Sequence, residues 1–244
     1  MIRQEEISLV IDSQREVFLK QDSGFSRDAL SQIPIVNSFA TIITGIRRCG
    51  KSTLLLQLLR RDYQNAIYLN FDDIRLSGFE TADFTRLHKE IERREIRVLF
   101  FDEVQVIENW EKFINQLLRE GYKVFITGSN ASMLSVELGT HLTGRHLSME
   151  LFPFSYSEFI RFKKLNNDEN AVIDYLKTGG IPEYVKSDVS YVLNALVDDI
   201  LMRDIAIRHS VRDVNSLRQL TAYLITNIGN LVSANKLSGM FDIK

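Results

Sequence analysis

The 244-residue chain is poor in several residue types and patterns, and each shortage excludes a class of protein. Its one cysteine, Cys49, cannot form an internal disulfide, so a reducing cytoplasm is the expected compartment. With three prolines and no low-complexity tract, the sequence argues against a long disordered linker. No apolar run approaches the roughly 20 residues needed to span a bilayer, and the acidic N-terminus is unlike a signal peptide. We therefore expect no membrane partner.

The chain also lacks a strong charge of either sign. Its 30 Lys and Arg against 32 Asp and Glu give a formal net charge of −2, which provides no general attraction to nucleic acid. A hydrophobic content of 45% and a charged content of 25% are ordinary for a globular protein. The length allows one large domain, or a medium domain with a smaller one.

The most informative segment is a glycine-framed loop, Gly45-Ile46-Arg47-Arg48-Cys49-Gly50-Lys51-Ser52, which Thr53 follows. It fits the pattern G-x-x-x-x-G-K-[ST] at every fixed position, between a β-prone run and a leucine-rich helical run. Such a loop turns its N–H groups inward and precedes a positive helix end, so it cradles a polyphosphate. Lys51 would reach the β- and γ-phosphates of ATP, and the Ser52 hydroxyl would hold Mg²⁺. The alternative is a fortuitous turn.

Apolar β-prone runs alternate with helical stretches in the first part of the chain, which predicts an α/β fold with a parallel sheet. We expect the strands at 39–44, 66–71, 97–101, 123–127 and 146–151. Strand signals stop at about residue 151, and the later segments have helical periodicity. The predicted organisation is a nucleotide-binding domain over 1–152, an all-helical lid over 153–230 and a further segment over 231–244.

An acidic pair, Asp102 and Glu103, is the second motif that a hydrolysis site needs beside the phosphate loop. The apolar run 98–101 leads into Asp102 and Glu103, so the third strand should carry Asp102 to the carboxyl edge of the sheet beside the phosphate loop. Asp102 can there hold a Mg²⁺ water opposite Ser52, and Glu103 can orient or deprotonate the attacking water. The alternative is a pair of solvated acids at a strand end.

The fourth predicted strand ends near Ser129 and Asn130, either of which could contact the γ-phosphate or the attacking water. The alternative role for each is to cap the helix that bears Met133, Leu134 and Leu138. The sequence does not choose between the two residues.

Taken together, several motifs resemble the archaeal and bacterial AAA+-like ATPases. They are GIRRCGKST, LFFDEVQVIENW, FITGSNASML, LTGR, LFPFSYSEF and GGIPE, and the resemblance covers residues 33–244. It implies a five-stranded sheet of order 5-1-4-3-2, ATP with Mg²⁺, and hydrolysis. In that family the helical part leads into a winged-helix segment, and many members carry a further nuclease-like domain.

Three arginines are candidates for neutralising transition-state charge, either in cis or from a neighbouring subunit. Arg145, just before the fifth strand, ranks first, Arg203 second and Arg208 third. For each, the alternative is a surface or ion-paired arginine. Arg47 and Arg48 occupy variable positions of the loop. We expect them either to contact phosphate or a partner, or to be solvated.

Other polar and aromatic groups carry weaker signals. Asp72 and Asp73 follow the second strand and are expected to cap or solvate a loop. The aromatic residues around Pro153 are expected to pack between the two domains rather than to stack on nucleic acid. The histidines have no metal-ligand spacing; they are His88, His141, His146 and His209.

Cys49 lies near the start of a predicted helix with Arg47, Arg48 and Lys51 as cationic neighbours, conditions that favour a thiolate. We therefore predict a reactive thiol that bound ATP shields. The alternative, a buried inert thiol, predicts slow modification with and without Mg-ATP.

Residues 231–244 are predicted to form a first helix, a turn and the opening of a second helix, as in an incomplete helix-turn-helix unit of a winged helix. Ser233 is the expected cap. No basic reading helix follows, so these 244 residues should bind DNA weakly or not at all. The alternative is a frayed helix packed on the lid.

The sequence thus predicts an ATPase whose hydrolysis drives or gates a conformational change between the α/β domain and the lid. Two other classes stay open. One is a signalling switch in which ATP binding rather than turnover is the output, and the other is the ATPase module of a DNA-processing protein. The partner, whether another protein or further copies of the chain, is not determined.

Overall fold

The computed structural model describes residues 1–128, 144–207 and 210–241. The chain divides into two compact units, residues 1–186 and 187–244. The first unit contains the sheet and the second is helical in the part that the structure describes.

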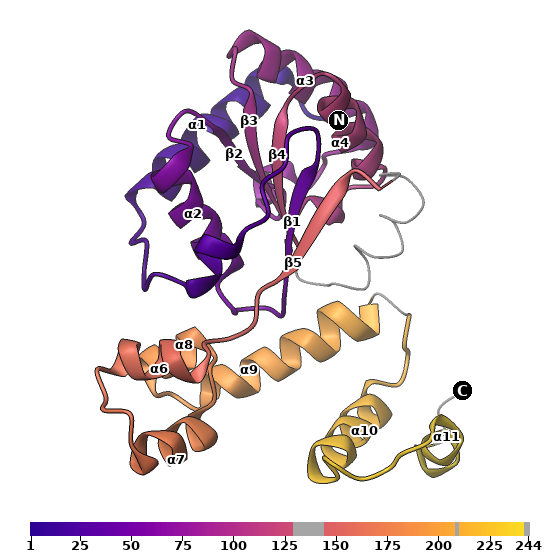
Figure 1. The fold of residues 1–244 in the computed structure, drawn as a ribbon. Helices are drawn as coiled ribbons and strands as arrows, with labels where there is room; N and C mark the ends of the chain where they lie inside the picture. Colours follow the sequence, from indigo (N-terminus) through magenta and orange to yellow (C-terminus); the bar gives the residue numbers. More distant parts are fainter. Residues whose placement is uncertain (129–143, 208–209, 242–244) are drawn as a thin grey trace. The chain divides into compact units, whose positions relative to one another are not determined.

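The first unit is built on a five-stranded parallel sheet of order β2-β3-β4-β1-β5 (Figure 1). Read from the other edge, this is the predicted order 5-1-4-3-2, so the expected α/β fold is confirmed. The strands lie within one or two residues of their predicted bounds. They are β1 (Ala40–Thr44), β2 (Ile67–Asn70), β3 (Val98–Asp102), β4 (Lys123–Gly128) and β5 (His146–Glu150).

Alternate residues of the strands pack into two separate hydrophobic cores, one on each face of the sheet. In β3, Leu99 and Phe101 pack with the apolar residues of α1, α3 and α4, whereas Phe100 packs with the leucines of α2. All three side chains are fully buried, as the unbroken apolar run of β3 predicts for a strand covered on both faces. The covering helices are α1 (Gln4–Lys20), α2 (Lys51–Asp62), α3 (Phe84–Arg93) and α4 (Trp110–Arg119).

Helix α1 is an element that the sequence analysis did not predict. Ile7, Val10, Ile11 and Phe18 are buried, and they follow the helical spacing i, i+3, i+4 and i+11. Each such side chain contributes about 1.5–3 kcal/mol when fully buried. The helix therefore belongs to the core, and its spacing was the available signal.

The helices that follow β5 belong to the first unit. A capping box starts the first of them as predicted, because Ser155 accepts from the N–H of Glu158 while the Glu158 carboxylate accepts from the N–H of Ser155. The expected boundary after residue 152 thus differs from the division at residue 186, since the segment from 153 packs on the sheet domain. The helices are α6 (Tyr156–Lys163), α7 (Glu169–Thr178) and α8 (Pro182–Ser187).

The aromatic residues around Pro153 separate into two groups. Phe154 and Phe159 are buried and pack with Val185 and Phe25. The predicted packing is therefore present, but it lies within the first unit rather than between the two units. Phe152 is 65% exposed and takes no part in this cluster.

The second unit contains helices and a π-helical segment. Residues 234–241 form one continuous helix that runs through Gly239, so the predicted turn and second helix within 231–241 are wrong. The Ser233 hydroxyl accepts from the N–H of Lys236, as a cap should. The elements are α9 (Tyr191–Asp199), the π-helix η5 (Ile200–Ile207), α10 (Val214–Thr226) and α11 (Ala234–Phe241).

Short 3₁₀ helices connect the main elements of the first unit. They are η1 (Asp28–Gln32), η2 (Ile74–Leu76), η3 (Thr81–Asp83) and η4 (Val104–Val106). Asp73 caps η2 by accepting from the N–H of Arg75, which confirms its predicted capping role. Hydrogen bonds from the Arg75 and Gln14 side chains hold the pKa of Asp73 far below its usual range.

Candidate nucleotide-binding and hydrolysis site

The phosphate loop connects the end of β1 at Thr44 to the start of α2 at Lys51. Its two fixed glycines have backbone conformations that side chains rarely adopt, with φ of 147° at Gly45 and 101° at Gly50. Gly45 also packs tightly, because a Cβ atom there would lie 2.3 Å from the Leu151 carbonyl oxygen. The loop therefore needs glycine for both conformation and space.

We predict that Gly45→Ala lowers the free energy of unfolding by about 3 kcal/mol or more, through backbone strain and overlap with Leu151. Chemical denaturation measures this change. Gly78→Ala is the control, because a Cβ atom at Gly78 meets no atom within 4 Å and should change stability by less than about 1 kcal/mol. Equal stabilities for the two variants would contradict the packing described for Gly45.

Lys51 is the first residue of α2 and is only 6% exposed. Its ammonium donates to the carbonyl oxygens of Gly45 (2.9 Å) and Ile46 (3.1 Å), so it lies over the loop. A buried cation favours an anionic partner, and the first N–H groups of α2 have no acceptor within the helix. Ser52 beside it is exposed and Thr53 is half-buried.

The strand register brings the acidic residues to the same edge of the sheet as the loop. Asp102, the last residue of β3, pairs with Thr127 of β4, and Thr127 pairs with Ile43 of β1. Neighbouring strands lie about 4.8 Å apart, so Asp102 is about 10 Å across the sheet from β1. The predicted juxtaposition of loop and carboxylates is therefore present.

Two hydroxyl groups orient the Asp102 carboxylate, which is 1% exposed. The Tyr68 hydroxyl donates to Oδ2 (2.9 Å), and the Thr127 hydroxyl donates to Oδ1. Burial and the charge of Asp102 raise the pKa of Tyr68 well above its usual range, so Tyr68 stays a donor. Hydroxyl and carboxylate oxygens suit Mg²⁺, and the burial of Asp102 fits contact through a metal-bound water, with Ser52 supplying the exposed oxygen.

Glu103 follows in the left-handed backbone conformation, with φ of 55°, which turns the chain sharply after β3. Its N–H donates to the carbonyl oxygen of Thr127 (3.2 Å), and its carboxylate accepts from the Gln105 amide. Burial raises the pKa of Glu103, and the neighbouring Asp102 charge raises it further. A carboxylate with a raised pKa is suited to general-base work.

Sequence reasoning missed three residues that support the carboxylates: Tyr68, Thr127 and Gln105. Tyr68 and Thr127 lie in predicted strands flanking β3, so their positions beside Asp102 could have been read from the strand order that the resemblance implies. For Gln105 the only signal was its position two residues after Glu103.

Several predicted residues fall elsewhere. Ser129 and Asn130 lie outside the described residues, so their sensor role stays a prediction. Arg145 precedes β5, and its carbonyl accepts from the N–H of Ala40, the first residue of β1. The loop follows the carboxyl end of β1, whereas Arg145 lies at the amino ends of β1 and β5. Since a five-residue strand rises about 15 Å, Arg145 is separated from the loop by the length of the strands. The expectation that it reaches the γ-phosphate in cis is wrong, whereas a role in a neighbouring subunit stays a prediction.

The other candidate arginines belong to the second unit. Arg203 of η5 forms an ion pair with Asp199, the last residue of α9 (3.8 Å), so it matches the alternative of an ion-paired arginine. Arg208 lies outside the described residues. Of the two loop arginines, Arg48 forms an ion pair with Glu183 of α8 (3.3 Å) and is not simply solvated.

Cys49 differs from its prediction. The side chain is fully buried among the leucines of α2 and is not a favoured thiolate. Burial raises the pKa of the Cys49 thiol, and this effect outweighs the nearby charges of Lys51 and Arg27. The thiolate prediction is therefore wrong, and the buried-thiol alternative describes this residue.

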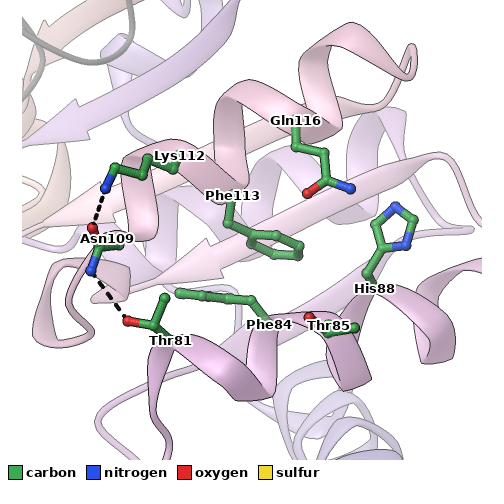
Figure 2. Close-up of a pocket in the computed structure, with 8 residues that line it drawn as sticks. All are labelled: Thr81, Phe84, Thr85, His88, Asn109, Lys112, Phe113 and Gln116. Atoms are coloured by element: carbon green, nitrogen blue, oxygen red, sulfur yellow. Dashed lines mark hydrogen bonds between the residues drawn. The ribbon is translucent and has the colours of Figure 1, made fainter.

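A cavity of about 450 Å³ lies between α3 and α4 (Figure 2), and its lining includes no residue of the loop and neither Asp102 nor Glu103. Stacked Phe84 and Phe113, with ring centroids 4.5 Å apart, form its apolar part. Its polar lining is Thr81, Thr85, His88, Asn109, Lys112 and Gln116. Throughout the described ranges, no three His, Cys, Asp or Glu residues are grouped as a metal site.

Comparison with known proteins agrees with this geometry. A family model described as "AAA domain" matches residues 37–160. An uncharacterised protein of Methanocaldococcus jannaschii is 32% identical over 226 residues, covering 86% of this chain and 51% of the relative. One of Haemophilus influenzae is 35% identical over 219 residues, covering 82% and 54%. The chain thus spans about half the length of these curated relatives.

Solved structures to which the chain shows a weaker similarity include the S. cerevisiae Hsp104–ADP complex and C. elegans PCH-2. The first is 15% identical and covers 95% of this chain and 36% of that chain, with a TM-score of 0.45. The second is 15% identical and covers 72% and 47%, with a TM-score of 0.36. Within the part of the chain that the structure describes, no helix is both long and apolar enough to cross a bilayer. From the family match and the phosphate loop, the chain belongs to the AAA domain family and is a P-loop NTPase.

Proposed function

We propose that the protein binds Mg-ATP and hydrolyses it to ADP and phosphate. The observation that carries this proposal is the placement of a buried Lys51 and an Asp102–Glu103 pair at one edge of the sheet, with only β4 between their strands. A kinase that transfers phosphate to another substrate should exclude water. A carboxylate positioned as a base beside the phosphate loop favours attack by water instead.

Each group has a separate role in this proposal. Lys51 and the N–H groups of the loop hold the β- and γ-phosphates, while Ser52 and Asp102 hold Mg²⁺ and its water. Mg²⁺, when bound, neutralises charge on the transferred phosphoryl group. Glu103 accepts a proton from the attacking water. Ser129 or Asn130 is proposed to contact the γ-phosphate.

The proposed output is a conformational change between the sheet and the helices that follow β5. Gly45 of the loop packs against Leu151, and Arg48 pairs with Glu183, so the loop contacts the segments at both ends of α6–α7. Slower backbone hydrogen exchange in residues 151–186 with a non-hydrolysable ATP analogue than with ADP would support this gating. Identical exchange in the two states would argue against it.

A signalling switch with little turnover is the second candidate. The hydrogen bond from Gln105 to the Glu103 carboxylate favours it, because a base engaged by an amide is less available to water. Tight ATP binding with turnover far below about one per minute would identify the switch. We do not propose a DNA-directed module, because no observation on the described residues favours one; residues 234–241 form a single helix.

The direct test measures ATP binding by calorimetry and phosphate release with Mg²⁺ or with excess EDTA. Binding and Mg²⁺-dependent release support the proposal. A chain that neither binds nor hydrolyses ATP would refute it. Measuring the particle mass in the same samples shows whether further copies of the chain assemble around the nucleotide.

Turnover should depend on pH through Glu103. Its pKa is raised above the ordinary value of 4.5, and a general base acts only when deprotonated. Turnover should therefore fall as pH decreases through this raised pKa. A kcat profile from about pH 4 to 9 should show an acid limb with an apparent pKa above 4.5; a limb at or below that value would contradict the assignment.

A further inference from the structure

Arg27, in the segment between α1 and η1, is a buried arginine to which neither the sequence analysis nor the proposed mechanism gives a role. Its side chain is 5% exposed, and its Nε donates to the Glu158 carboxylate (2.8 Å), which is 4% exposed. Its Nη1 donates to the carbonyl oxygen of Cys49 (2.8 Å), and its Nη2 to that of Phe152 (2.8 Å). The guanidinium also lies over the Phe154 ring, 5.0 Å from its centroid.

These contacts join three parts of the sequence: the segment before η1, the phosphate loop, and the connection from β5 to α6. Glu158 strengthens the junction, since it also accepts from the N–H groups of Asp28 (2.9 Å) and Ser155 (3.0 Å). The pair is thus satisfied on both sides, as a buried ion pair must be. A planar, rigid guanidinium is the side chain that can meet this set of acceptors.

The bond to Cys49 has a consequence for the loop. The carbonyl of Cys49 and the N–H of Gly50 belong to one planar trans peptide, in which they point in opposite directions. By holding the Cys49 carbonyl on its own side, Arg27 directs the Gly50 N–H away from itself. Gly50, with φ of 101°, has no side chain to restrict rotation of this peptide. An external partner is therefore needed to fix it.

We propose that Arg27 is a positioning residue for phosphate binding, which it serves by fixing the Cys49–Gly50 peptide of the loop through its ion pair with Glu158. The inference rests on the proposed nucleotide function for its ligand. The structural part of the inference is that the ion pair keeps the loop in the conformation that buries Cys49. This part is testable without nucleotide.

The test uses Arg27→Lys and Glu158→Gln. Arg27→Lys keeps the positive charge but loses the planar guanidinium with its several N–H donors. Glu158→Gln keeps the shape of the side chain but loses its negative charge. The matched controls are Arg94→Lys and Glu90→Gln. They alter an ion pair of similar burial at the end of α3, with side chains 14% and 1% exposed, in which Arg94 also pairs with Asp12 of α1. Cys49 is the single thiol of the chain, so its rate of modification by a small disulfide reagent reports opening of the loop.

With folded protein at a temperature well below unfolding, both test variants should modify Cys49 at least about tenfold faster than the parent, and both controls should stay near the parental rate. Mg-ATP affinity should fall at least about tenfold, which corresponds to about 1.4 kcal/mol, in the test variants alone. Circular dichroism verifies the fold. If Arg27→Lys does not fold, the isosteric Glu158→Gln variant alone is used for both measurements, the rate of Cys49 modification and the affinity for Mg-ATP.

Parental thiol rates and parental affinity in the test variants would overturn the inference while the proposed function stands. Equal acceleration in test and control variants would reduce Arg27 to a general stabilising role and would also overturn it. A parent that binds no Mg-ATP overturns the proposed function and the phosphate-binding part of this inference. Faster thiol modification only in the test variants would still support the fixing of the loop.

Discussion

Glu103→Gln is expected to bind Mg-ATP with parental affinity and to hydrolyse it about 10²–10⁴ times more slowly. The substitution keeps the size of the side chain and its capacity to accept from the Gln105 amide, but it removes the basic oxygen. Calorimetry with Mg-ATP and single-turnover phosphate release measure the two properties separately.

Glu95→Gln provides a matched control for that variant. Glu95 has the same left-handed backbone conformation as Glu103, with φ of 54°, but it is exposed in the turn before β3, at the other end of the strand. Its substitution should leave both binding and turnover unchanged. Parental turnover in Glu103→Gln would show that another group activates the water, and loss of binding would show that Glu103 supports the site rather than the chemistry.

Lys51→Ala is expected to weaken Mg-ATP binding at least about thirtyfold, because removing one partner of a buried charge pair costs about 2–5 kcal/mol. The side chain is 6% exposed and lies over the loop carbonyls, so bulk water does not replace its charge at the phosphates. Equilibrium binding of a fluorescent ATP analogue measures the loss.

Lys89→Ala is the control for this experiment, since Lys89 is an exposed lysine on α3, remote in sequence from the loop. It should bind like the parent. If Lys51→Ala also bound like the parent, the glycine-framed loop would not be the phosphate site, and the proposed function would fail with it. Weakened binding in Lys51→Ala beside retained binding in Glu103→Gln would establish that anchoring and water activation are separate.

The parts of the site that could be predicted from the sequence are those in which local pattern determines position. A glycine-framed loop between a strand and a helix defines its own conformation, because only glycine suits φ of 147° and 101° at its fixed positions. An apolar run ending in Asp102 places that carboxylate at a strand end, and parallel strands bring their carboxyl ends to one edge. These short-range relations located Lys51, Ser52, Asp102 and Glu103.

The tertiary structure decided what depends on contacts between distant residues. Arg27 and Glu158 are 131 positions apart and have no sequence pattern that pairs them. From its place just before the fifth strand, Arg145 ranks first for transition-state contact, but β5 runs parallel to β1, and the length of the strands separates Arg145 from the loop. Cys49 has cationic neighbours in the sequence, yet packing against the leucines of α2 removes it from water, and desolvation outweighs those charges. Local sequence determined which groups the site contains, whereas burial and strand direction decided which of them act there.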